Sequence, residues 1–169
     1  GSPSSEKARD PDEGPQHQVT LPRAFAVAMF DVTKDEYATF VRETGHPSGD
    51  GCLGFDSSGN WVNRPSADWL DPGFPQTGGD PVVCVSWEDA QAYVQWINTK
   101  VRADRKVPAS AGPGPYRLIT EAEFEYAARA GTNTPRTWSD KADSEHANIG
   151  RDPCCGGSSS GSPHVAIIF

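Results

Sequence analysis

The first apolar pattern in the chain is a strict alternation. Between positions 19 and 29 the large apolar side chains all fall on odd numbers: Val19, Leu21, Phe25, Val27 and Met29. A period of two is typical of half-buried β-strand. Pro22 lacks a backbone N–H, so we expect it to break this strand into two pieces.

Three later segments carry the helical period, and each begins with the same signal. A Ser or Thr is followed three residues later by Glu or Asp, and each of the two side chains can satisfy a free backbone N–H of the first turn. The three pairs are Thr33 with Glu36, Ser86 with Asp89, and Thr120 with Glu123. The predicted apolar faces are Tyr37, Phe40, Val41 and Thr44 in the first helix, and Trp87, Ala90, Val94, Ile97 and Val101 in the second.

The segments between these helices differ in character. We expect 46–80, which is rich in Gly, Pro, Asp and Ser, to be a long loop pinned by four buried rings: Phe55, Trp61, Trp69 and Phe74. The short apolar run 81–85 predicts a buried strand, with Cys84 as a buried core thiol. The proline-containing segment 103–115 predicts an exposed connector.

Composition narrows the class of protein. A chain of 169 residues fits one domain, and its 17 Gly and 15 Pro indicate many turns and short regular elements. The net charge of −8 argues against non-specific binding to nucleic acid or to an anionic membrane, which needs clustered Lys and Arg. No apolar run approaches the roughly 20 residues of a membrane span, so we expect a soluble chain.

The composition also changes along the chain. We expect the polar residues 1–16 to form a flexible lead-in, and 17–150 to form the folded domain. The tail 151–169 is atypical, because it is almost without charge and ends on five apolar residues. A native C-terminal strand and a truncated or frame-shifted end both remain open for this tail, and we favour the second.

Candidate chemistry is sparse. Cys52 is either a free surface thiol or half of a disulfide, and Cys154 with Cys155 form a vicinal pair in a predicted loop. Four isolated histidines are expected at the surface: His17, His46, His146 and His164. Asp56, Ser58 and Asn60 begin like a calcium loop, but Trp61 and Ala67 stand where Gly and Glu would be required, so a turn is favoured.

Two stretches carry a family resemblance. Segment 116–132 includes Thr-Glu-Ala-Glu-Phe-Glu-Tyr-Ala-Ala-Arg-Ala-Gly, and segment 81–90 reads Pro-Val-Val-Cys-Val-Ser-Trp-Glu-Asp-Ala. With 1–3, 12–21, 27–40 and 69–75, they resemble in order and spacing the formylglycine-generating enzyme, or sulfatase-modifying factor, family. The resemblance covers about 1–149. Ile119 and Phe124 stand where the family commonly has Pro and Trp, and both remain apolar.

The resemblance implies a fold and an activity. The fold is α+β, a variant of the C-type-lectin-like architecture with short helices, small twisted sheets and much irregular chain. Full members bind copper(I) with two spaced cysteines near the C-terminus and use oxygen to convert a cysteine of a client sulfatase to Cα-formylglycine. That cysteine pair and the late Gly-Asn-x-Trp-Glu-Trp, Arg-Gly-Gly-Ser and Gly-Phe-Arg segments are not in this sequence. We therefore expect 17–150 to be an incomplete sulfatase-modifying-factor domain, inactive by itself.

The resemblance also suggests a metal site. Family members bind structural calcium, and Asn148 with the backbone of Ile149 matches the start of one such site. The alternative function is a non-catalytic C-type-lectin-like module that binds a ligand or a protein. An accessory domain of a sulfoxide-synthase-like iron enzyme is a third reading, but the histidine-rich motif that it requires is not found in 1–16.

Overall fold

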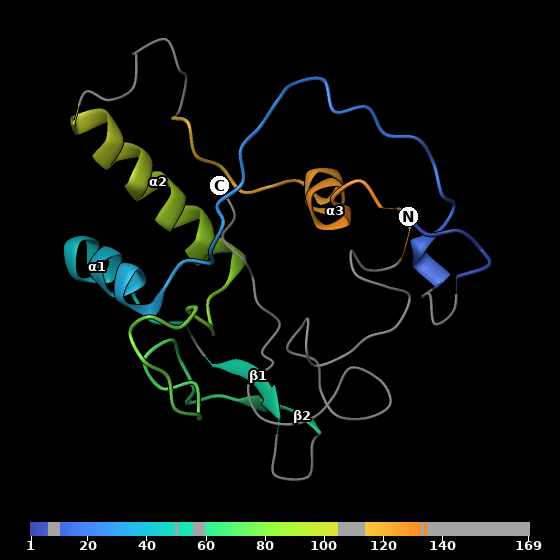
Figure 1. Cartoon of the computed structure of the whole chain (residues 1–169). Coiled ribbons are helices and arrows are strands. Elements are labelled where there is room, and N and C mark those ends of the chain that lie inside the picture. Colours follow the sequence, from blue (N-terminus) through green and yellow to red (C-terminus); the bar gives the residue numbers. More distant parts are fainter. Residues whose placement is uncertain (7–10, 50, 56–59, 105–113, 133, 135–169) are drawn as a thin grey trace. The chain divides into compact units, whose positions relative to one another are not determined.

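The fold is known from a computed structural model, which describes residues 1–6, 11–49, 51–55, 60–104, 114–132 and 134 (Figure 1). The chain divides into two compact units. The first contains Gly1–Ala26 and Thr120–Ala147, and the second contains Val27–Ile119 and Asn148–Phe169. Each is described by itself below. Among the described residues, three α-helices and one small sheet give an α+β fold.

The second unit is built on two helices, α1 (Lys34–Thr44) and α2 (Trp87–Ala103), which lie side by side in Figure 1. Both begin at the predicted capping boxes, with Thr33 and Ser86 as N-caps. α1 ends at Gly45, whose φ of 69° is the left-handed conformation that glycine adopts without penalty. The sequence thus predicted both helices and their first residues.

The core of this unit lies between α1 and α2 and the segments beside them. Tyr37 and Phe40 of α1 are its largest fully buried side chains. The Phe40 ring centroid lies 5.5 Å from that of Tyr93 on α2, and the Tyr37 centroid lies 5.3 Å from that of Trp69. Edge-on and tilted rings of this kind combine apolar burial with favourable ring–ring contact. Of the four rings predicted to pin the loop, Trp69 is buried and Phe74 is half-buried, while the side chains of Phe55 and Trp61 lie outside the described part of the structure.

A polar contact joins the same two helices at their outer edge. Glu43 of α1 accepts hydrogen bonds from Trp96 Nε1 at 3.1 Å and from Lys100 Nζ at 2.7 Å, both on α2. The predicted apolar face of α2 needs one correction. Trp87 is exposed, because it directly follows the N-cap, and Tyr93 is buried beside Ala90 and Val94 instead.

Two predictions in this unit were wrong. Segment 46–80 contains an antiparallel hairpin, β1 (Cys52–Phe55) with β2 (Trp61–Arg64), in which Cys52 faces Arg64 and Phe55 faces Trp61. Segment 81–85 is not a strand: it makes one isolated bridge, Thr33 with Pro81, and Val82 donates to the Val32 carbonyl at 2.9 Å. Val82 and Val83 are buried as expected, but Cys84 has a φ of 56° and turns the chain away from an extended path.

The first unit contains a short 3-10 helix, η1 (Pro11–Glu13), and α3 (Glu121–Arg129). α3 begins at the third predicted capping box, with Thr120 as N-cap. In the part described, residues 1–6 are joined to 11–16 by a hydrogen bond from the buried Ser2 N–H to the Glu13 carbonyl, 3.1 Å long. The division of the chain into lead-in, domain and tail stays a prediction.

The prediction of strands in the alternating segment 19–29 was also wrong. The structure describes all of it and contains no strand there. Met29 is 83% exposed, and Val19 is also exposed. A period of two identifies the side chains that could share one face, but a strand also needs a partner for its backbone, and no residue in the described ranges pairs with this segment.

Candidate functional site

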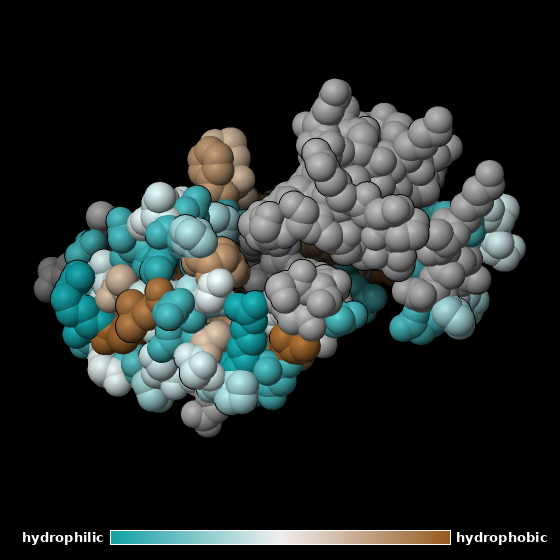
Figure 2. Space-filling view, turned by 90° about the horizontal axis from the view of Figure 1, so that it is seen from below, coloured by the Kyte–Doolittle hydropathy of each residue, from teal (hydrophilic) through white to brown (hydrophobic). Residues whose placement is uncertain are grey.

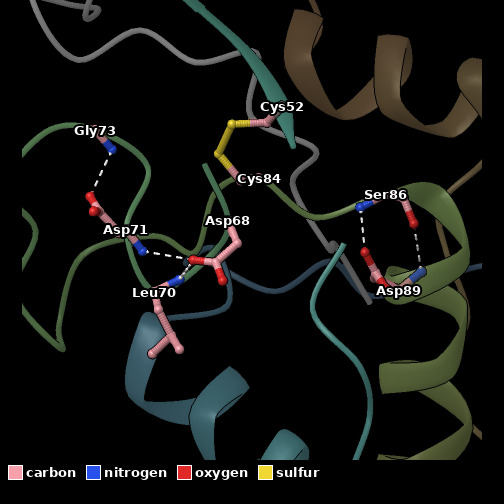
Figure 3. The surroundings of a disulfide bond; sticks show 8 residues. All are labelled: Cys52, Asp68, Leu70, Asp71, Gly73, Cys84, Ser86 and Asp89. Atoms are coloured by element: carbon pink, nitrogen blue, oxygen red, sulfur yellow. Dashed lines mark hydrogen bonds between the residues drawn. A yellow bond between two sulfur atoms is a disulfide. The ribbon is translucent and has the colours of Figure 1, made fainter. Parts of the chain in front are cut away.

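Ser86, Asp89 and His46, whose side chains are of types used in acid–base chemistry, meet at the N-terminus of α2. The N-cap is closed from both sides: the Ser86 N–H donates to Asp89 Oδ2 at 2.8 Å, and the Asp89 N–H donates to Ser86 Oγ at 3.1 Å (Figure 3). Both groups would otherwise be unpaired N–H donors at a helix start. The Asp89 carboxylate is therefore fixed in position, with one oxygen occupied by the cap.

The other oxygen of that carboxylate pairs with His46. His46 Nε2 lies 2.6 Å from Asp89 Oδ1, and the two side chains are 20% and 12% exposed. The His46 ring also packs against Phe40, with centroids 4.9 Å apart. His46 was predicted at the surface, and this was wrong. It follows Gly45, the residue that turns the chain at the end of α1, and that turn brings it to α2.

The environment of Asp89 determines its charge. Burial raises the pKa of the carboxyl, but the hydrogen bonds from the Ser86 backbone, from His46 and from the Ser86 side chain outweigh burial and hold the pKa below its usual value. Asp89 is thus ionised at neutral pH, and it can hold a histidine ring in one orientation.

A histidine–carboxylate pair occurs in many acid–base sites, and Ser86 is two bonds away in the same network. However, the Ser86 hydroxyl oxygen is the acceptor of the cap and has no hydrogen bond from His46. A nucleophilic serine needs a base within hydrogen-bond reach of its hydroxyl. The cluster therefore has the geometry of a structural latch between the end of α1 and the start of α2.

A disulfide lies beside this cluster. Cys52 of β1 is bonded to Cys84, two residues before the N-cap Ser86, with 5.2 Å between the Cα atoms (Figure 3). Cys84 is therefore not the free core thiol that the sequence predicted, and of the two alternatives for Cys52 the structure has the disulfide half. An even number of cysteines permits such a bond, but spacing alone does not reveal which cysteines pair.

Carboxylates in the neighbouring loop serve the backbone. Asp68 Oδ1 accepts the N–H groups of Leu70 and Asp71, each at 2.9 Å, and Asp71 Oδ1 accepts that of Gly73 at 3.1 Å (Figure 3). These are Asx turns, in which a short side chain replaces a backbone acceptor. Within the described part of the chain, no three His, Cys, Asp or Glu residues are grouped so that they could hold a metal ion.

Most of the other candidate residues are not in the described part of the chain. Asn148 and Ile149, the vicinal pair Cys154 and Cys155, and His146 with His164 lie outside the described residues, as do Asp56 and Ser58. The acids of α3 are described: Glu123 caps the helix through its contact with the Thr120 N–H at 3.0 Å, and Glu125 pairs with Arg129 at 2.9 Å. Glu123 thus serves the start of the helix, and Glu125 forms an ion pair with Arg129, one turn away.

Comparison with known proteins identifies the family. The family model of the sulfatase-modifying factor enzyme 1-like domain matches residues 1–163, so the chain belongs to the FGE-sulfatase family. The match establishes the family, and the helices and small sheet described above establish the α+β class.

Individual relatives agree with this assignment. The chain is 33% identical to the formylglycine-generating enzyme of Mycobacterium tuberculosis, over 78% of this chain and 49% of the relative. It is 32% identical to the enzyme of the same name from Streptomyces coelicolor, over 76% and 43%. A mouse protein named inactive C-alpha-formylglycine-generating enzyme 2 is 31% identical, over 70% and 42%. The chain thus spans about half the length of the curated relatives that it matches.

Proposed function

We propose that this chain is the N-terminal part of a formylglycine-generating-enzyme-type domain with a C-type-lectin-like fold. In the whole domain the activity would be the oxidation of a cysteine in a client protein, such as a sulfatase, to Cα-formylglycine with copper(I) and oxygen. The observation that carries this proposal is the family match, which runs along nearly the whole chain and includes all three capped helices.

The chain by itself is proposed to be inactive. Copper(I) is held by thiolates, and the two cysteines in the described residues are bonded to each other. They do not fit a copper site. Cys154 and Cys155 are adjacent in sequence, and adjacent residues cannot place two sulfurs on opposite sides of a linear copper ion without severe backbone strain.

A structural calcium ion is part of the same proposal. Asn148 would supply a side-chain oxygen and Ile149 a backbone carbonyl oxygen, which are ligand types that calcium accepts. The remaining ligands would have to come from other residues of a full-length domain. Loss of stabilisation by calcium in an Asn148→Ala variant of such a domain would support this assignment.

The alternative is a non-catalytic member of the family that binds a ligand or a protein. This alternative rests on the mouse protein named inactive: its identity of 31% is close to the 33% of the named enzyme from M. tuberculosis, so identity alone does not separate the two classes. In the described part of the chain no helix is long and apolar enough to cross a membrane.

One experiment tests the proposal and separates the two classes. The chain is incubated with copper(I), oxygen and a peptide that contains Cys-x-Pro-x-Arg, with the M. tuberculosis relative as positive control, and the peptide is analysed by mass spectrometry. We expect no formylglycine from the chain alone. Formylglycine in that sample would overturn the inactive reading.

The same peptide with serine in place of cysteine provides the second readout. It cannot be converted, so fluorescence polarisation reports binding alone. We expect no binding by the chain, because the proposed function assigns peptide recognition to the whole domain. Saturable binding without conversion would instead favour the non-catalytic module.

A further inference from the structure

The Cys52–Cys84 bond joins two segments whose bonded residues are 32 positions apart in the sequence. On one side is the hairpin β1–β2, whose strands have four residues each. A two-stranded hairpin is marginally stable in water unless it packs on something else. Leu53, in the middle of β1, is exposed. On the face shown in Figure 2, exposed apolar side chains in general lie singly or in small groups among hydrophilic ones.

The hairpin also begins under steric constraint. Gly51, just before Cys52, has a φ of 89°, and a Cβ at this position would lie 2.6 Å from the carbonyl oxygen of Arg64. The start of β1 thus approaches the end of β2 closely, where only glycine fits. This close approach fixes the backbone position of Cys52. Through the disulfide it also restrains the position of Cys84.

The other side of the bond is the segment that leads into α2. Val82 and Val83 are buried, and Ser86 must reach the N-cap position, so the chain has to turn between them. The turn is made at Cys84, which adopts a left-handed φ of 56°. This conformation is disfavoured for a residue with a Cβ and persists where its surroundings impose it. The cross-link to Cys52 is one such restraint, placed on the residue that needs it.

We propose that Cys52–Cys84 is a redox-sensitive clasp, which in its oxidised form holds the hairpin to the segment that begins α2. A dithiol reductant opens it: two electrons and two protons pass from the dithiol to the two sulfurs, the S–S bond breaks, two thiols form, and the reductant becomes a disulfide. The hairpin is then released. Cys84 is free to leave the left-handed conformation, which loosens the Ser86 cap and the His46–Asp89 pair beyond it.

The first test is the thiol state of the protein as purified without reductant. Differential alkylation and peptide mapping should show Cys52 and Cys84 protected, and joined in one cross-linked peptide pair. Both should become reactive after treatment with dithiothreitol. Full alkylation of both residues before reduction, in folded protein, would overturn the proposal.

The second test asks whether the bond controls structure. Hydrogen–deuterium exchange is compared with and without dithiothreitol. Reduction should speed exchange at least about tenfold in β1, in β2 and in the first turn of α2, and leave the centre of α1 unchanged. Unchanged exchange in the hairpin after full reduction would show that the bond is passive and would overturn the switch.

Variants supply matched controls for the second test. Cys52→Ser/Cys84→Ser should exchange like the reduced wild type and show no response to dithiothreitol. Cys154→Ser/Cys155→Ser removes the other two cysteines of the chain and should retain the full response. If the first variant does not fold, the reduced wild type still gives the answer. An equal response in the first variant would overturn the proposal.

The clasp has a consequence for the cell. Disulfides of folded domains form and persist in oxidising compartments, so the inference assigns the folding of this chain to such a compartment. Alkylation of thiols before lysis of the cells that make the protein should leave Cys52 and Cys84 unmodified. Complete modification of both in the folded protein would contradict this assignment.

Discussion

α1 and α3 begin in the same way and differ in everything that follows the first turn. Each has a Thr N-cap, a Glu three residues later, and both reciprocal hydrogen bonds of the capping box. Yet α1 buries Tyr37 and Phe40, whereas no residue of α3 is buried. Phe124 and Tyr126 of α3 are 50% and 65% exposed.

The difference separates two sources of helix stability. Caps satisfy backbone N–H groups inside the helix itself, so their contribution is available wherever the helix stands. Burial of an apolar face needs a partner, and in most proteins it supplies the larger share of helix stability. α1 has α2 as its partner, while the described ring contact of α3 is Tyr126 with Phe25, whose centroids are 6.2 Å apart.

The test with the largest expected effect removes one aromatic ring from each helix. Phe40→Ala should lower the free energy of unfolding by about 3–5 kcal/mol, because Phe40 is 1% exposed and its removal leaves a cavity. Phe124→Ala should cost less than about 1 kcal/mol, because half of that ring is already in water. Urea unfolding of the whole chain gives both values. Equal losses would show that the burial of Phe40 is not what distinguishes the helices.

A second test concerns the polar anchor of α2. Asn98 is 7% exposed, donates from Nδ2 to the Tyr116 carbonyl at 2.9 Å, and accepts the Tyr116 N–H on Oδ1 at 3.1 Å. Gly114 makes room for this bridge, since a Cβ there would collide with the Asn98 side chain. Asn98→Ala should cost about 2–3 kcal/mol, because two backbone groups lose these bonds.

The matched variant for this bridge is Asn98→Asp. It keeps the size of the side chain and the acceptor for the Tyr116 N–H, but it places a carboxylate oxygen opposite the Tyr116 carbonyl. Urea unfolding above pH 6 should therefore show a loss for Asn98→Asp as well, whereas Asp at the exposed Thr99 should change little. A neutral result for both Asn98 variants would mean that the two hydrogen bonds contribute nothing measurable.

The same division explains what the sequence could predict. Helix starts depend on residues three positions apart, so Thr33, Ser86 and Thr120 were readable directly. The hairpin was missed because its pairing joins Cys52 to Arg64 and Phe55 to Trp61 across residues rich in Gly, Ser and Asp, which read as loop. Strands pair with distant residues, and a single sequence shows such pairs only when a turn signal and an alternation coincide.

The candidate site followed the same rule. Ser86 and Asp89 were predicted as a cap, and they form one. The partner of Asp89 was not predicted, because His46 is 43 residues away and carries no local signal of burial. Cys84 was assigned to the core from its apolar neighbours, and Val82 and Val83 are indeed buried, but the thiol itself turns to Cys52. The apolar neighbours of a residue in the sequence thus predict that its segment is buried, but they do not predict which cysteine it bonds to.

Acid titration offers a third test, at the cap of α2. The pKa of Asp89 is lowered in the folded chain, so its contribution to stability is present above the pKa of the unfolded state and is lost as pH falls below about 4. Asp89→Asn should cost about 1–2 kcal/mol at neutral pH, because the charged hydrogen bonds are lost. The loss should shrink toward pH 3. Urea unfolding at both pH values measures it, and a cost that does not change with pH would rule out the charge as its cause.

The smallest expected effect, loss of the capping hydroxyl, gives the most direct comparison of α1 with α3. Thr33→Ala and Thr120→Ala remove the same capping hydroxyl, worth about 1 kcal/mol to a helix. In α1 the loss should appear in full in global unfolding, because Tyr37 and Phe40 tie that helix to the core. In α3 the global change should be only a few tenths of a kcal/mol, since a helix without buried residues can open by itself, and the loss should appear as faster amide exchange confined to 121–129. Equal global losses would mean that α3 unfolds together with the core, and the contrast drawn from burial would then fail.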